Sequence, residues 1–132
     1  MRLERKLLKL TYRTYMKTNE KIKAVPYCRV SSKEQEETGY SLPAQEKLIQ
    51  EYGDRKDMIM DKIFSIAESA SGAKQRKVFD EMMQYVVDNE INILLCEKVD
   101  RITRNFKEAI VINDWLEADP NRQIHFVKQN LV

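Results

Sequence analysis

The stretch YCRVSSKEQ, residues 27–35, places an arginine two positions before a serine, where a short apolar run gives way to polar residues. The planar fork of an arginine binds phosphate oxygens through parallel hydrogen bonds. A serine hydroxyl becomes a nucleophile when its surroundings favour the alkoxide-like state. Arg29 and Ser31 could therefore form an anion clamp beside a nucleophile. An ordinary turn at the end of a strand explains the same residues, because serine is common in turns.

Two further polar clusters follow apolar runs: ESASGAKQR at residues 68–76 and EKVDRITR at residues 97–104. Singly, each has a simple structural explanation. Arg76 can be a solvated side chain, and Asp100 and Arg104, four residues apart, can form a surface ion pair. Together, several arginines near one serine repel one another unless concentrated negative charge binds. A phosphodiester in its transition state supplies that charge, and phosphoryl transfer depends mainly on positioning and charge neutralisation.

Other chemistries fit these residues poorly. A cysteine phosphatase loop needs an arginine six positions after its cysteine, and that position after Cys28 is Glu34. The chain has no GxxxxGK[ST] motif, and its three glycines cannot form a dinucleotide fingerprint. One histidine and no CxxC argue against a zinc site. His125 lies in an apolar run and is expected to be a core or edge residue, not part of a triad. We therefore expect no metal and no other cofactor.

Composition indicates one polar globular domain of 132 residues, 42% hydrophobic and 33% charged. Neither a secretory signal nor an apolar run of membrane-spanning length is visible, so we expect a cytoplasmic protein without membrane association. Cys28 and Cys96 lie in apolar runs and are expected to be reduced and buried. Net charge is +2, but residues 1–22 hold seven basic and two acidic residues. The remainder is slightly acidic, so any phosphate contact must come from local arginine clusters.

Apolar periodicity predicts strands alternating with helices. Strands are expected at residues 24–30, 58–67, 91–99 and 123–129, and helices at 41–53, ended by Gly53, at 77–89 and at 106–118. This alternation favours an α/β fold with a mostly parallel sheet of four to five strands and helices on both faces. The strand at 91–99 is apolar on both faces and should be central. The carboxyl ends of parallel strands share one rim, where the three polar clusters should converge.

The three clusters, in this order and at this spacing, resemble the catalytic domain of serine recombinases, the family of resolvases, invertases and the large integrases and transposases of mobile elements. The matching segments are YCRVSSKEQEETGYSLPAQ, SGAKQRKVFDEMM and EKVDRITR, and the resemblance covers about residues 22–130. The portion TGYSLPAQ is similar to the large integrases and transposases. The resemblance implies a resolvase-like three-layer α/β domain at residues 22–132. Residues 1–21 form a basic extension, which we expect to be helical.

The resemblance also implies roles for individual residues. Ser31 matches the nucleophile that attacks a DNA phosphodiester and forms a 5′-phosphoserine bond, and Ser32 is a helper or bystander. The other positions that match the catalytic set are Arg29, Arg76, Asp100, Arg101 and Arg104, with Gln35, Gln45, Glu68 and Ser71 in supporting places. Two departures lie outside this set. Ala67 stands where many large members have aspartate, and Lys77 stands where proline or glycine is common.

The family acts on double-stranded DNA as a dimer that assembles into a synaptic tetramer, without a metal in the active site. Its members continue after the last strand into a long dimerisation helix and DNA-binding domains. We therefore expect this chain to be part of a larger recombinase, able to fold but unable to recombine DNA alone. Two alternatives stay open: a non-catalytic oligomerisation or regulatory fragment of a recombinase, and a general phosphate-binding α/β domain.

Overall fold

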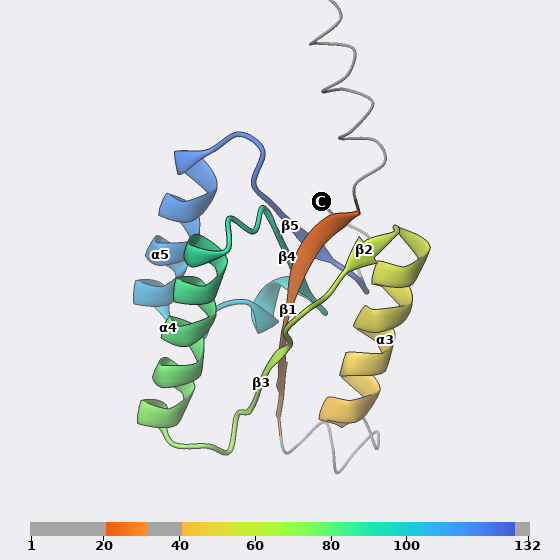
Figure 1. Cartoon of the computed structure of the whole chain (residues 1–132). Helices are drawn as coiled ribbons and strands as arrows, with labels where there is room; N and C mark the ends of the chain where they lie inside the picture. The colour runs from red at the N-terminus through yellow and green to blue at the C-terminus, as the bar shows by residue number, and fades with distance from the viewer. Residues whose placement is uncertain (1–20, 32–40, 129–132) are drawn as a thin grey trace, which may run out of the picture.

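The computed structural model describes residues 21–31 and 41–128, which form a parallel sheet with helices on both faces. Figure 1 shows helix α3 (Leu42–Arg55) against one face, and helices α4 (Gly72–Asp88) and α5 (Phe106–Ala118) against the other. The predicted three-layer α/β class is therefore confirmed. The helix predicted in the N-terminal extension lies outside the described residues. Within the described ranges, no helix is both long and apolar enough to cross a membrane.

The sheet is organised around β1 (Ile22–Val30). Along one edge β1 pairs with β4 (Ile93–Cys96), and along the other it pairs with β2 (Met58–Ile59) and then with β3 (Phe64–Ala67). Strand β5 (Gln123–Phe126) pairs with β4, and all of these pairings are parallel. Because β4 lies between β1 and β5, its predicted central position is confirmed.

Several strand predictions need correction. Strand β1 begins two residues before the predicted start at residue 24, and β5 ends at Phe126 instead of continuing to residue 129, because a turn follows at residues 127 and 128. The single strand predicted at residues 58–67 is wrong, because β2 and β3 are separate strands that pair with different parts of β1. Asp61 and Lys62 lie between them and are exposed, so this charged pair interrupts the apolar run. The strand predicted at 91–99 is shorter, since β4 ends at Cys96 and a 3₁₀ turn, η1 (Val99–Arg101), follows.

The helix boundaries follow side-chain caps that the periodicity did not show. Helix α3 begins as predicted after Ser41, whose Oγ accepts a hydrogen bond from the N–H of Ala44 at 3.3 Å. The predicted end at Gly53 is wrong, because the helix continues to Arg55 and the left-handed residue that follows it is Asp57, at φ 58°. Gly53 is buried, and a Cβ there would collide with the side chain of Met60.

The other two helices show the same dependence on caps. Helix α4 starts at Gly72 instead of the predicted Lys77, because Ser71 Oγ accepts the N–H of Lys74 at 3.2 Å. Helix α5 has the predicted bounds. Asn105 Oδ1 caps it by accepting the N–H of Glu108 at 2.9 Å.

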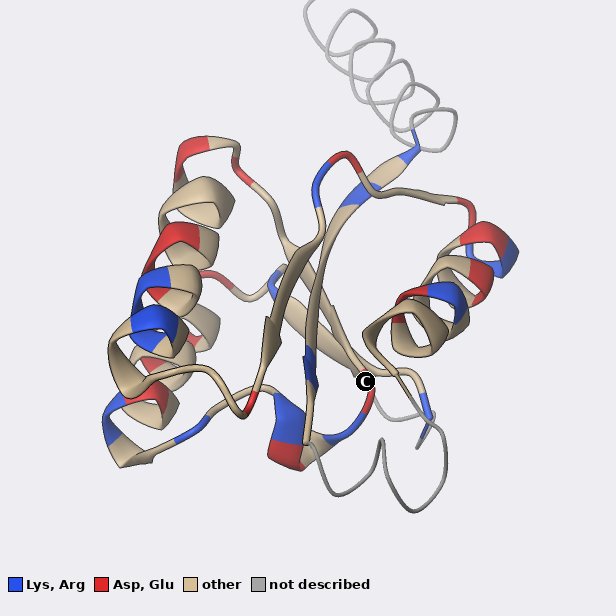
Figure 2. Ribbon diagram, turned by 90° about the horizontal axis from the view of Figure 1, so that it is seen from below, with Lys and Arg blue, Asp and Glu red and all other residues tan. Residues whose placement is uncertain are grey.

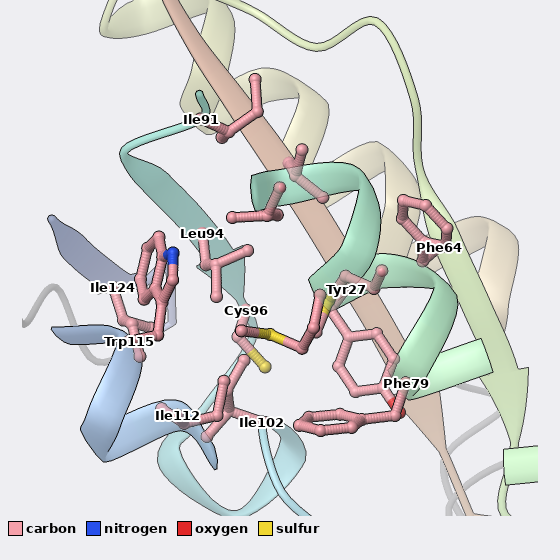
Figure 3. Packing of buried hydrophobic residues seen from close by; sticks show 14 residues of the cluster. Tyr27, Phe64, Phe79, Ile91, Leu94, Cys96, Ile102, Ile112, Trp115 and Ile124 are labelled. Carbon is pink, nitrogen blue, oxygen red and sulfur yellow. The ribbon is translucent and has the colours of Figure 1, made fainter. Parts of the chain in front are cut away.

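Apolar side chains form one cluster on each face of the sheet. The larger cluster packs β1, β4 and β5 against α4 and α5 and contains Tyr27, Phe79, Leu94 and Trp115 (Figure 3). Tyr27 and Phe79 meet edge to face, with ring centroids 6.3 Å apart. Cys28 and Cys96 are free and buried, as predicted. Burial raises the pKa of both thiols to about 12, so neither is a thiolate at neutral pH.

His125 is buried on the other face of the sheet, as predicted for a core residue. Its Nε2 lies 2.9 Å from Gln123 Oε1 and its Nδ1 lies 2.7 Å from the hydroxyl of Tyr52. These contacts fit a neutral ring that donates from Nε2 and accepts at Nδ1. Burial, and secondarily the charge of Lys56, lower the pKa of His125 below its ordinary value.

We predict that Glu90→Gly stabilises the protein by about 0.5–1 kcal/mol, because glycine removes the steric cost of a left-handed residue. Glu90 has φ 54° and follows the C-cap of α4, where the N–H of Ile91 bonds to the carbonyl of Val86 at 2.9 Å. Urea denaturation measures the change. Glu90→Ala is the matched control, since it removes the charge and keeps the Cβ. An equal gain in both variants would contradict the backbone explanation.

We also predict that the free energy of unfolding falls as the pH drops from about 7.5 to 5.5. A histidine whose pKa is lowered by folding stabilises the folded state above its unfolded pKa, and this contribution is lost as the pH falls through the lower folded value. Urea denaturation at several pH values tests the effect. The His125→Gln variant should be less stable than the parent at neutral pH, and its free energy of unfolding should change less across this pH range. A parent that gains stability towards pH 5.5 would contradict the assignment.

Candidate active site

The carboxyl ends of β1, β3 and β4 meet at one rim of the sheet, as expected for parallel strands. Figure 2, seen from below, looks onto this rim and shows the charged ribbon of η1 beside the end of β1. Ser31 directly follows β1 and is partly exposed. The carbonyl of Val30 accepts the N–H of Glu68 at 3.0 Å, which joins the first polar cluster to the second.

The side chain of Arg29 joins the first cluster to the third. It is only 5% exposed, and its Nη2 donates to the main-chain carbonyls of Asp100, at 2.7 Å, and Thr103, at 2.9 Å. Its Nε lies 3.6 Å from a carboxylate oxygen of Glu68. Asp100 is exposed, and the contact that it makes with Arg29 comes from its carbonyl oxygen, not from its carboxylate. Arg29 therefore fixes the turn that carries the DRITR residues.

Glu68 is a shared counter-ion for two arginines. Its Oε1 accepts a hydrogen bond from Arg101 Nη1 at 2.7 Å, and the same oxygen makes the contact with Arg29. Both guanidinium groups are largely buried, whereas the Glu68 side chain is 32% exposed. The repulsion expected between arginines in an empty site is thus relieved by a carboxylate of the chain. One carboxylate facing two guanidinium groups leaves positive charge at the rim.

Arg104 is more open than the other two arginines of the rim, with 29% of its side chain exposed. Its Nε lies 3.7 Å from Glu108 Oε2, and its main-chain N–H donates to Glu108 Oε1 at 2.9 Å. A Cβ added at Gly72 would lie 3.3 Å from Arg104 Nη1, so the start of α4 runs close beside this side chain. The sequence reasoning missed Glu108, although its place three residues after the cap Asn105 is a recognisable helix-start pattern.

Buried amides hold the main chain around the site. Gln45 is fully buried, and it accepts the N–H of Arg29 at 2.9 Å and donates to the Arg29 carbonyl at 3.2 Å. It also donates to Glu97 Oε2 at 2.9 Å. Gln75 donates to the carbonyls of Glu68 and Ala70, at 3.1 and 3.0 Å, and so fixes the turn between β3 and α4. Glu97 and Gln75 carried no signal in the sequence pattern.

Two further candidates, Arg76 and Ser71, lie beside this network, and no side-chain hydrogen bond or ion pair among the described residues joins them to it. Arg76 is exposed and lines a small cavity of about 90 Å³ between α4 and α5, together with Asn105, Lys107 and Glu108. Ser71 acts as the cap of α4. Gln35 and Ser32 lie outside the described residues. Among the described residues, no group of three or more His, Cys, Asp or Glu side chains could hold a metal ion.

Comparison with known protein families identifies the family of this chain. The family model for the resolvase N-terminal domain matches residues 24–131. Comparison with curated protein sequences gave no match.

Solved structures similar to this chain are also recombinase domains. A resolvase family site-specific recombinase from Streptococcus pneumoniae has a TM-score of 0.66 and 24% identity, with 84% of this chain and 75% of that chain covered. The N-terminal catalytic domain of TP901-1 integrase has a TM-score of 0.65 and 16% identity, with 83% and 80% covered. The C-terminal catalytic domain of ISC1926 TnpA, an IS607-like serine recombinase, has a TM-score of 0.59 and 28% identity, with 80% and 67% covered.

We predict that Arg29→Lys lowers the free energy of unfolding by about 1.5–3 kcal/mol, the usual range for hydrogen bonds of a charged group. A compact ammonium cannot reach two carbonyls and a carboxylate in the planar arrangement of the guanidinium. Arg76→Lys is the matched control and should change stability by less than about 0.5 kcal/mol, because the side chain is exposed. Urea denaturation measures both. Similar losses in the two variants would contradict the anchoring role of Arg29.

Proposed function

Because this chain belongs to the resolvase family, the serine recombinases, we propose that it is the catalytic domain of a site-specific recombinase of a mobile element, acting in integration or excision. The observation that carries the proposal is the network around Arg29. This residue and Glu68 join all three polar clusters into one rim, beside the position of Ser31. Such a rim suits a substrate that brings concentrated negative charge, and a DNA phosphodiester is that substrate.

In the proposed reaction, Ser31 Oγ attacks the phosphorus of a DNA phosphodiester. The new bond is a phosphoserine ester to the 5′ side, and the bond to the 3′ oxygen breaks. The serine proton leaves to a base or water, and the 3′ oxygen takes up a proton as a hydroxyl. Rejoining reverses these steps with a 3′-hydroxyl of the exchanged strand. The ester keeps the free energy of the cleaved bond, so no external energy source is required.

The arginines have two proposed tasks. Arg29 and Arg101 are buried and already bound by Glu68, so they hold the rim in shape before DNA arrives. Arg104 is more exposed and is the candidate for direct contact with the phosphate oxygens as their charge grows. Arg76 is the candidate for an outer contact, from the start of α4. Asp100, Ser71, Gln45 and Gln35 are proposed to support these groups.

The proposed partners are double-stranded DNA and further copies of the chain, as a dimer and then as a synaptic tetramer. We propose the domain at residues 22–132 and the basic extension at residues 1–21. Binding to DNA by this domain alone should be weak and salt-sensitive, since it offers few groups that neutralise phosphates.

The test is a covalent adduct with DNA. The chain is fused to a DNA-binding domain of known site. A suicide substrate is nicked so that the short fragment carrying the free 3′-hydroxyl dissociates after cleavage, which prevents rejoining and traps the intermediate. We predict a protein–DNA adduct with the parent and with Ser32→Ala, and none with Ser31→Ala, because only Ser31 supplies the attacking oxygen. Denaturing gel electrophoresis detects the adduct.

Three results would count against this function. An adduct that survives Ser31→Ala and disappears in Ser32→Ala would move the nucleophile to the neighbouring serine. No adduct in the parent, while the fusion still binds DNA and self-associates, would favour the non-catalytic module. Binding of inorganic phosphate without any cleavage would favour the general phosphate-binding domain.

A further inference from the structure

We propose that Glu97 is a positioning residue for the nucleophile, acting through Gln45 on the main chain of Arg29; this inference rests on the function proposed above. Glu97 follows β4 directly and is only 1% exposed. A buried carboxylate is unfavourable unless it is hydrogen-bonded and paired with positive charge. Lys128 Nζ lies 3.5 Å from Glu97 Oε1, and the Lys128 side chain is 56% exposed, so it supplies only a partial counter-charge. The other carboxylate oxygen, Oε2, faces Gln45.

Both the oxygen and the nitrogen of the Gln45 side-chain amide are hydrogen-bonded within the protein. Its Oε1 accepts the N–H of Arg29, and its Nε2 donates both to the Arg29 carbonyl and to Glu97. An amide nitrogen has two hydrogens, and Glu97 takes the one that Arg29 does not use. Because a carboxylate only accepts, Glu97 fixes which end of the Gln45 amide faces β4. The carbonyl end must then face the N–H of Arg29.

This orientation matters because Arg29 lies only two residues before Ser31. Its main chain is held by Gln45, and its side chain is held by the carbonyls of Asp100 and Thr103. Loosening the main-chain bonds would displace both the guanidinium and the strand end that carries the serine. A displacement of about 1 Å in a reacting group can lower a rate by about 100-fold. Glu97 thus acts at a distance from the phosphate, without contacting it.

The experiment compares Glu97→Gln with Glu97→Leu in the fusion protein. A glutamine keeps an acceptor for Gln45, whereas a leucine leaves a buried N–H without one. We expect Glu97→Gln to stay within about 3-fold of the parent, and Glu97→Leu to lower both the amide protection of Arg29 and the adduct rate by about 10-fold or more. DNA affinity should be unchanged. Glu46→Gln is the matched control. Glu46 is the sequence neighbour of Gln45, but its carboxylate accepts a hydrogen bond from Ser65 and not from Gln45, so this variant removes a carboxylate charge without touching the Gln45–Glu97 bond.

Hydrogen exchange separates positioning from a merely structural role. Loss of protection at Arg29, with Leu94 in β4 unchanged, supports the proposal. Unchanged protection at Arg29 in Glu97→Leu, or an equal loss at Leu94, overturns it. If the parent forms no adduct, the proposed function is wrong, and so is the proposal that Glu97 positions Ser31 for the reaction. Exchange at Arg29 still shows separately whether Glu97 orients Gln45.

A second pair of variants covers the case in which Glu97→Leu alone does not fold. The double variant Gln45→Leu/Glu97→Leu removes both members of the hydrogen bond between these two side chains, so neither side chain is left unsatisfied. Its reference is Gln45→Leu, in which the main chain of Arg29 has already lost the bonds to Gln45. If Glu97 acts only through Gln45, adding Glu97→Leu to Gln45→Leu should not lower the adduct rate further. A further loss of about 10-fold or more would overturn the proposal.

Discussion

The burial of one guanidinium organises this rim. Arg29 lies near the end of β1 with its side chain 5% exposed, and a buried positive charge is unfavourable without acceptors and a counter-charge. The two main-chain carbonyls come from the turn after β4, and the carboxylate comes from the turn after β3. To satisfy Arg29, the chain must therefore bring three distant segments together. This requirement, more than any single contact between motifs, explains why the polar clusters share one place.

The parallel sheet makes that convergence possible. Parallel pairing puts the carboxyl ends of β1, β3 and β4 at the same rim, and the apolar clusters on the two faces keep the strands in register. Caps then set where the chain leaves each strand. Ser71 starts α4 earlier than its apolar pattern indicates, so the turn from β3 is short and Glu68 stays close to Arg29. The chemistry of the rim thus depends on local signals as well as on the sheet.

The sequence predicted those features that arise from regular spacing. The α/β class, the central β4 and the bounds of α5 follow from apolar periodicity, and the three clusters were expected at strand ends. Features that depend on long-range contacts were missed. Glu97 pairs with Gln45, which lies 52 residues earlier, and Glu68 pairs with Arg101, 33 residues later. Nothing within a short window tells that Glu97 is buried or that Glu68, although expected at the site, pairs with Arg101, so both pairings became visible only in three dimensions.

The same contacts divide the arginines by what they can do. Arg29 and Arg101 donate hydrogen bonds to other residues of the same chain. Their main effect is therefore to shape the rim and to leave a positive potential there. Among the described residues, Arg104 is paired with Glu108 at a longer distance, and its side chain is more exposed. A phosphate oxygen can displace a 3.7 Å contact with a carboxylate more readily than a 2.7 Å hydrogen bond. In the proposed function, Arg104 is therefore the first arginine to contact a phosphodiester, and Arg29 and Arg101 keep the carboxyl end of β1 in place.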